Sequence, residues 1–290
     1  MNKKLKVTAI IGLAAMVLGG ATMVIGYFGN HGKLDSIILN QGFKIQKIEK
    51  KTRNITAFKD LKISSNDVDL QVVQGSKFKL TTSLDQTDTF KVTQKDGQLQ
   101  IDSTNSVTRH GLSFSNSQRK IIVTVPHDTK LENIKIKTFD GTISLKNITA
   151  TKRVEINQTD GGVILKNVNL SDLNVVNKDS GTRVEGGQIS NATFKNIDGN
   201  FLAIGTTFTG TNKITLDDGE VYLNELKQNL EISADVNDGS IAHNGKAVGN
   251  DNQDSDSSHG IIGASQENKL AVQVADGSIS ISDTKKDEDY

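Results

Sequence analysis

Residues 134–146, IKIKTFDGTISLK, decide the fold of this chain, because their pattern recurs along most of the sequence. Similar stretches are 154–166, VEINQTDGGVILK, and 212–224, NKITLDDGEVYLN. Each has alternating apolar residues on both sides of an Asp-Gly pair. Alternation with a period of two is typical of a half-buried strand, and Asp-Gly is typical of a tight turn. The pattern therefore predicts two strands joined at a corner.

This corner recurs with a nearly constant spacing. Turn dipeptides stand at Asp140-Gly141, Asp160-Gly161, Ser180-Gly181, Asp198-Gly199, Asp218-Gly219, Asp238-Gly239 and Asp276-Gly277, with Gly-to-Gly spacings of 20, 20, 18, 20, 20 and 38 residues. The fourth residue before each dipeptide is apolar: Ile136, Ile156, Val176, Phe194, Ile214, Ala234 and Val272. The second residue after each Gly is Ile143, Val163, Arg183, Phe201, Val221, Ile241 and Ile279. We expect Val184 to replace Arg183 through a one-residue bulge.

One such unit cannot bury its apolar side chains alone. Stacked units can, because equivalent residues then lie above one another at about 4.8 Å. We therefore predict an all-β fold, a single-stranded parallel β-helix or β-solenoid with coils of ~20 residues, over residues 55–284. Because Asp-Gly is also a strong hairpin signal, an antiparallel β meander is the alternative. We interpret 55–126 as the opening part, 104–119 and 243–260 as polar loops, the latter inserted between coils, and 285–290 as a charged tail.

The first 54 residues differ in composition. Three lysines precede an uncharged run of 22 residues, Val7–Phe28, which is long enough to cross a bilayer at ~1.5 Å per residue. We predict that residues 1–28 form a cytoplasmic tip and a single transmembrane anchor, with the β domain outside the membrane. A cleaved signal peptide is the alternative. Residues 29–54, with the basic run Lys44–Arg53, are predicted to be a juxtamembrane stalk, either solvated or attracted to anionic lipid or wall polymer.

Composition excludes several classes of site and partner. The chain has no Cys, which excludes disulfides, thiolate metal sites and a cysteine nucleophile. It has no Trp and only 4% aromatic residues, which argues against stacking of sugars or bases. The formal net charge is zero, so no nucleic-acid partner is expected. The five histidines, none spaced as in a helical zinc site, are His31, His110, His127, His243 and His259.

Catalysis has weak support in the residues. Polysaccharide-cleaving enzymes need an acid and a base that converge on the glycosidic bond. Asp217-Asp218 and Ser258-His259-Gly260 faintly match, but Asp218 shares a turn role with the other corner aspartates. The recurring Asp residues suggest calcium binding, but the sequence lacks the nonapeptide repeat of calcium-binding proteins. We therefore predict no enzyme and assign no catalytic, cofactor-binding or metal-binding residue and no cofactor. A polysaccharide-active β-helix enzyme is the alternative.

Several segments resemble the bacterial putative-adhesin family, a domain of unknown function with β-strand repeats. They are NITAFKDLKISSNDVDLQVVQG (54–75), DGQLQID (96–102), IIVTVPHDTKLENIKIKTFDGTISLKNI (121–148) and the later Asp-Gly repeats. The resemblance covers roughly Thr52 to Ser282, and the loop His243–Gly260 departs from it. It implies a β-solenoid outside the membrane without catalytic residues to transfer. Some relatives belong to Lia-type cell-envelope stress systems of Gram-positive bacteria.

Anchor, repeat and resemblance lead to one functional expectation. We predict a membrane-anchored, extracytoplasmic, non-enzymatic β-repeat module in the cell membrane. Its expected partners are the membrane, through Val7–Phe28, and an envelope protein or a wall polymer. Its expected role is adhesin-like or part of a cell-envelope stress response.

Overall fold

The computed structural model describes residues 3–29, 37–39, 43–45, 48–86, 88–104, 110–112, 119–226, 229–249 and 257–284. The contacts within the chain divide it into two units. The first combines Met1–Ile48 with Val107–Ser117, and the second combines Glu49–Ser106 with Gln118–Tyr290. Each unit is described by itself.

The first unit holds helix α1 (Lys3–Gly29) and a small antiparallel sheet. The sheet has the strand order β2 (Phe43–Ile45), β1 (Ile37–Leu39) and β9 (His110–Leu112). Strand β9 lies within residues 104–119, which the sequence predicts to be a loop. Helix α1 covers the predicted anchor. Among the residues that the structure describes, no helix is both long and apolar enough to cross a membrane.

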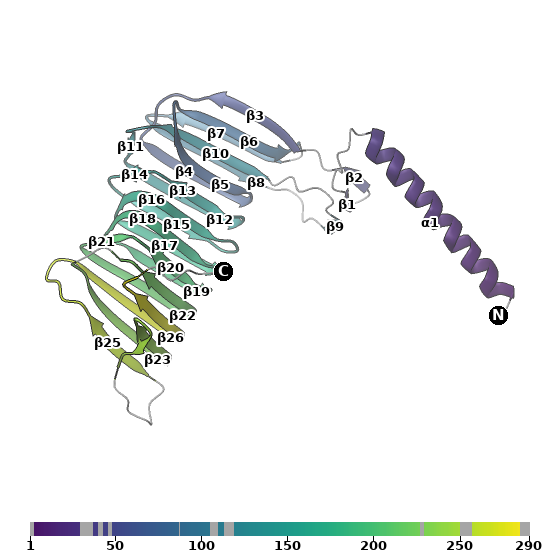
Figure 1. Ribbon diagram of the computed structural model, residues 1–290. Helices are drawn as coiled ribbons and strands as arrows, with labels where there is room; N and C mark the ends of the chain where they lie inside the picture. Colours follow the sequence, from purple (N-terminus) through teal and green to yellow (C-terminus); the bar gives the residue numbers. More distant parts are fainter. Residues whose placement is uncertain are drawn as a thin grey trace. The chain divides into compact units, whose positions relative to one another are not determined.

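The second unit consists of strands, and the all-β prediction is confirmed. Its first stack contains, in spatial order, β7 (Thr89–Lys95), β8 (Gln98–Thr104), β4 (Asp60–Asp67), β12 (Asn133–Asp140), β15 (Val154–Gln158), β17 (Leu173–Asp179), β19 (Thr193–Asp198), the first halves of β22 (Thr211–Asn224), β26 (Lys269–Ser282) and β23 (Glu231–His243), and then β25 (Ser258–Ile262). Figure 1 shows these strands side by side along the stack.

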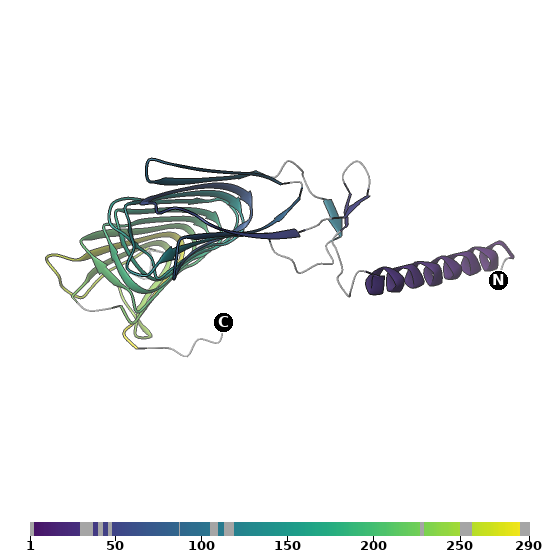
Figure 2. The ribbon, with the colours of Figure 1, turned by 90° about the horizontal axis from the view of Figure 1, so that it is seen from above.

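Two further stacks complete the coils. The second contains β3 (Ile48–Asn54), β6 (Lys79–Asp85), β10 (Lys120–Pro126), β5 (Asp69–Gly75), β13 (Ile143–Lys146), β16 (Val163–Ser171), β18 (Thr182–Ser190), β20 (Phe201–Ile204), the second halves of β22, β26 and β23, and β24 (Lys246–Ala247). The third contains β11 (Lys130–Leu131), β14 (Thr149–Ala150), the later parts of β16 and β18, and β21 (Thr207–Thr209). Figure 2, which looks along the stack, shows the coils overlying one another.

The repeats pair in parallel and in register, because each coil runs in the same direction as the coil below it. Ile143 lies opposite Val163, for example, and Phe201 lies opposite Val221. In the described part of this unit, antiparallel pairs occur at the two ends of the stacks: β10 with β6 and β7 with β8 at one end, β23 with β24 and β25 at the other. The alternative of an antiparallel meander is therefore wrong for the repeats.

Inward-facing aliphatic and aromatic side chains fill the inside of the coils. One internal column, buried along its whole length, consists of Ile136, Ile156, Val175, Phe194, Ile214, Val272 and Ala234. The Phe194 ring packs edge-on against the Phe201 ring, with centroids 4.9 Å apart. Burial of this continuous apolar surface is what holds the stack together, since no single coil has a core of its own.

Two of the predicted inward positions are wrong by one residue. Val175 occupies the slot predicted for Val176. Thr182 occupies the slot between Val163 and Phe201, so the expectation that Val184 replaces Arg183 there through a bulge is wrong. Val184 fills the next inward position, between Leu165 and Ala203. The cause lies at the third corner, where Asp179, not Ser180, pairs with the next corner residue, Asp198. The pairing register between these coils therefore aligns the corner aspartates and the inward apolar residues, and it does not align the glycines.

The order of the coils departs from the order of the sequence at the carboxyl end. Strand β26 lies between β22 and β23 and pairs in parallel with both. Consequently Gly277 stacks between Gly219 and Gly239. Within the 38 residues before Gly277, the chain first forms the terminal coil and then runs back to place β26 between β22 and β23. This spacing does not represent two coils added in sequence.

The amino-terminal end of the second unit is also rearranged. The coil formed by β4 and β5 lies directly against β12 and β13, although more than fifty residues separate them in sequence. The chain between them forms β6, β7, β8 and β10, which cover the other side of that coil. Strand β3, within the predicted stalk, pairs with β6. The predicted tail 285–290 lies outside the described residues.

Candidate binding site

The structure separates the two groups that the sequence suggested for catalysis. Asp217 lies on β22 and its carboxylate is 3.8 Å from the Lys195 ammonium. His259 lies on β25, and its Nδ1 is 2.5 Å from the Asp235 carboxylate. Asp218 takes its place in the corner row between Asp198 and Asp276. Strands β23 and β26 lie between β25 and β22. The structure therefore does not bring His259 together with Asp217 and Asp218 as an acid and base pair.

The remaining histidines are dispersed. His243 Nε2 is 3.1 Å from Asp283, whose carboxylate also accepts a hydrogen bond from Asn244. His127 is exposed after β10, His110 lies in β9, and His31 lies outside the described residues. Across the described parts of the chain, no three His, Cys, Asp or Glu side chains gather as metal ligands would.

The corner aspartates form a row along the stack. Pairings in register join Asp67 to Asp140. A second series joins Asp179, Asp198, Asp218, Asp276 and Asp238 in turn. Partial burial raises the pKa of the Asp140 carboxyl above its usual value, and the nearby Asp67 and Asp160 carboxylates raise it further. Asp140 also accepts a hydrogen bond from the Gly141 amide at 2.6 Å. This local bond is the turn role that the sequence predicts for these residues.

A ladder of buried amides beneath the corners was not predicted from the sequence. Gln158, Asn177 and Asn196 face inward at equivalent positions of successive coils. Gln158 Nε2 donates to the Gly141 carbonyl, and Asn177 Nδ2 donates to the Ser180 carbonyl. These amides thereby bind backbone carbonyls at the corners, as Asn196 does with the Asn200 carbonyl. The ladder is structural, and its signal in sequence is a polar residue two positions before the corner aspartate.

Ion pairs join lysines and glutamates of neighbouring coils. The Lys152 and Lys59 ammonium groups lie 2.6 and 2.9 Å from the Glu132 carboxylate. Their hydrogen bonds, that of Lys152 first, lower the pKa of Glu132 to about 2. Glu155 and Glu185 are paired in the same way with Lys135 and Lys166, and the pKa of each is lowered. Other described lysines have no carboxylate within 4.0 Å, and three of these lie together.

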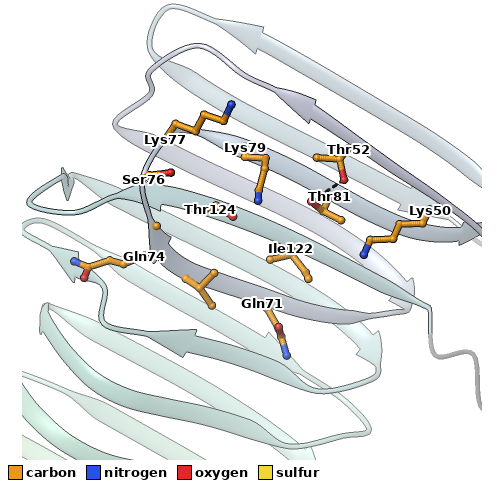
Figure 3. Close-up of a pocket in the computed structure, with 12 residues that line it drawn as sticks. Lys50, Thr52, Gln71, Gln74, Ser76, Lys77, Lys79, Thr81, Ile122 and Thr124 are labelled. Atoms are coloured by element: carbon orange, nitrogen blue, oxygen red, sulfur yellow. Dashed lines mark hydrogen bonds between the residues drawn. The ribbon is translucent and has the colours of Figure 1, made fainter.

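Such a group lines a groove on the outer face of the second stack, hereafter the lysine groove. Its volume is about 570 Å³. Strands β3, β5, β6 and β10 and the turn between β5 and β6 provide its lining: Lys50, Thr52, Gln71, Val73, Gln74, Gly75, Ser76, Lys77, Lys79, Thr81, Ile122 and Thr124. Figure 3 shows Lys50 and Lys79 extending into the groove, with Lys77 near the turn. None of these lining residues carries a carboxylate.

The alternation of the strands explains why these side chains share one face. On β10, Val123 and Val125 face the core, so that Ile122 and Thr124 face the groove. Thr124 is nevertheless only 8% exposed, because it lies against Gly75, where a Cβ atom would be 2.5 Å from its Cγ2. The Thr52 and Thr81 hydroxyls are 3.2 Å apart across the groove floor (Figure 3). The absence of a side chain at Gly75 thus leaves room for Thr124 in the floor.

A buried arginine fixes the start of β10. The side chain of Arg119 is 6% exposed, and its guanidinium lies 2.7 Å from Asp67 and 2.6 Å from Asp88. The backbone carbonyl of Arg119 accepts a hydrogen bond from the Asp69 amide at 3.0 Å. Buried charge-assisted arginine contacts of this kind have a defined geometry. They therefore hold β10 and β5 in the register that builds the groove floor.

The groove was not predicted from the sequence. The basic run Lys44–Arg53 pointed to positive charge near this part of the chain, and Lys50 belongs to both. The lysines of the turn and of β6 gave no separate signal, because they belong to the groove only once β6 lies between β3 and β10.

Solved structures of low identity resemble the chain. A putative cell adhesion protein from Clostridium sporogenes is 13% identical, with 81% of this chain and 99% of that chain covered and a TM-score of 0.35. Putative adhesins from Bacteroides fragilis and Parabacteroides merdae are 12% and 9% identical, cover 81% of this chain and 97% and 96% of their own, and give TM-scores of 0.36 and 0.33. No curated protein matches the chain.

The family is shown by a different comparison. Residues 58–282 match the family described as Toastrack DUF4097. The match includes the repeats, the rearranged ends and most of the strands that build the lysine groove. It confirms the resemblance to a domain of unknown function that the sequence indicated. Because it spans well over half of the 290 residues, the chain belongs to the Toastrack DUF4097 family.

Proposed function

We propose that this protein is a non-enzymatic, adhesin-like module of the bacterial cell envelope that holds a ligand in the lysine groove. One observation carries the proposal: the groove is open and lined by three lysines and by no carboxylate. Such a lining binds by charge and hydrogen bonds. It offers no acid and base pair, which cleavage of a glycosidic bond requires.

Attachment to a membrane is part of this proposal, with the amino terminus in the cytoplasm and the second unit outside. Its support is the uncharged run Val7–Phe28 after three lysines. Helix α1 exposes apolar side chains along its described length: Ile11, Leu13, Met16, Val17, Leu18, Val24, Ile25 and Phe28. This part of the proposal rests on the sequence, because no membrane-spanning helix is found among the described residues.

In-cell photo-crosslinking tests the proposal on the full chain. A photoreactive residue at Gln74, on the groove, should capture an envelope component, whereas one at Lys213, on the outer face of β22, should not. Protease treatment of intact cells should remove the second unit. Equal capture from both positions, or capture from neither, would contradict the proposed binding role, and full protection from protease would contradict the orientation.

The alternative, a polysaccharide-active enzyme, is tested separately. The full chain is incubated with acidic polysaccharides, and reducing ends and unsaturated products are measured. We expect neither to increase above the level without protein. An increase that is lost in a His259→Ala variant would favour the enzyme and locate it at the His259–Asp235 pair.

A further inference from the structure

We propose that the lysine groove binds a linear envelope polymer whose repeating units carry phosphate groups. The inference rests on the proposed binding function and names the chemistry of its ligand. Three features of the groove support it: uncompensated positive charge, donors suited to phosphate oxygens, and a size that exceeds one phosphate group.

The charge of the groove is uncompensated. Among the described residues, Lys50, Lys77 and Lys79 have no carboxylate within 4.0 Å. Other exposed lysines also lack such a partner, but these three line one concave surface together. Glu49, the nearest acidic residue in sequence, is paired with Lys51 at 2.9 Å. A concave surface lined by charge of one sign concentrates its field and attracts ligands of the opposite sign. The complementary ligand is an anion.

The donors of the groove suit phosphate oxygens. The lining contains lysines, threonine and serine hydroxyls and glutamine amides, but no arginine. Arginine binds carboxylates and phosphates alike through two parallel hydrogen bonds, whereas lysine binds either as a point charge. Lysines and hydroxyls impose no planar geometry, so they suit the tetrahedral arrangement of phosphate oxygens. Hydroxyl and amide donors, as at Thr52, Ser76 and Gln71, can reach the remaining phosphate oxygens.

The size and shape of the groove favour a chain over a single ion or a membrane. A volume of about 570 Å³ lies in the range of pockets that hold drug-sized ligands. The lysines come from β3, from the β5–β6 turn and from β6, so they can contact successive anionic groups. Val73 and Ile122 provide apolar floor for the carbon skeleton between phosphates. A planar lipid surface would meet the rim of the groove and leave this floor uncovered.

The test measures binding of the full chain, purified in an uncharged detergent, to synthetic poly(glycerol phosphate) by calorimetry. Replacing all three lysines (Lys50→Gln, Lys77→Gln, Lys79→Gln) should weaken binding by about tenfold or more, since each charged contact adds modestly and the effects accumulate. The matched control replaces Lys62, Lys137 and Lys213, exposed lysines on the outer face of the first stack, by Gln. It should change binding less than about twofold. Equal loss in both variants would overturn the proposal.

Further arms separate the ligand classes. Inorganic phosphate should bind far more weakly than the polymer, and polygalacturonate, which carries carboxylates, should bind more weakly as well. Equal or tighter binding of polygalacturonate, or binding of phosphatidylglycerol vesicles that the triple groove variant abolishes, would overturn the assignment of a phosphate polymer. A Gln71→Glu variant, which adds a negative charge with little change in size, should weaken polymer binding without changing thermal unfolding.

The outcomes distinguish this inference from the proposed function. Capture of an envelope protein at Gln74 without polymer binding would leave the binding module intact and remove the polymer. Polymer binding followed by release of shorter products would keep the ligand class and overturn the non-enzymatic role.

Discussion

Individual glycines at the corners have no substitute, because the backbone of the next coil occupies the space of a side chain. At Gly277, with φ of 138°, a Cβ atom would lie 1.9 Å from the Gly219 carbonyl oxygen. We predict that Gly277→Ala destabilises the protein by about 3 kcal/mol or more, since strained backbone and a clash with fixed atoms add together. Urea unfolding followed by circular dichroism measures this loss.

Gly205 is the matched control for this prediction. Its φ is also positive, at 58°, but an added Cβ atom would have no other atom within 4 Å. Gly205→Ala should therefore cost only the left-handed backbone penalty, about 1 kcal/mol. Equal losses for the two variants would show that backbone conformation, and not the stacked carbonyl, determines the need for glycine at the corner.

At the scale of single elements, β26 is the last strand in sequence but an interior strand in space. We predict that Ala271→Pro destabilises the carboxyl-terminal coils by about 2 kcal/mol or more, because proline removes an amide from a ladder that has partners on both sides. Ala271 is half-buried and lies between Lys213 and Ser233. Hydrogen exchange of β22 and β23 should accelerate together. Ala271→Thr, which keeps the amide, is the control, and unchanged exchange in the proline variant would contradict the interior position.

The local pattern of a strand carries more information than its place in the stack. Alternation and corner residues predicted the repeat strands and most inward positions, because each depends on neighbours within one coil. The inward positions predicted around the third corner were wrong, because they were counted from Gly181. The pairing register there is set by Asp179, two residues earlier. The insertion of β26 was not predictable, because Gly277 fits equally well beside Gly219 or beyond Gly239.

At the scale of the whole molecule, the lysine groove shows why a site can be invisible in sequence. Its lysines Lys50 and Lys79 belong to strands that do not follow one another, and they meet with Ile122 only through the rearranged end of the stack. No local sequence motif predicts that β3, β6 and β10 lie side by side. The predicted absence of catalytic, cofactor and metal residues stays a prediction.

The row of corner aspartates also belongs to the whole stack, and one of its members, Asp140, opposes folding at neutral pH. Because the folded chain raises the pKa of Asp140 above its usual 3.8, the folded state binds the proton more tightly than the unfolded state. Stability contributed by this group is therefore present at low pH and falls as the pH rises through the raised value. We predict that Asp140→Asn stabilises the protein at pH 7 and has little effect at pH 3, as measured by urea unfolding at both values.

Glu132→Gln is the counterpart of opposite sign. Its pKa is lowered to about 2, so the variant should lose stability at pH 7, and the loss should shrink as the pH falls from about 4.5 toward 2. High salt should reduce both differences, because it screens exposed charges. If Asp140→Asn instead destabilised the protein at pH 7, the negative charge on the acceptor would strengthen the hydrogen bond from the Gly141 amide by more than the burial and the neighbouring carboxylates cost.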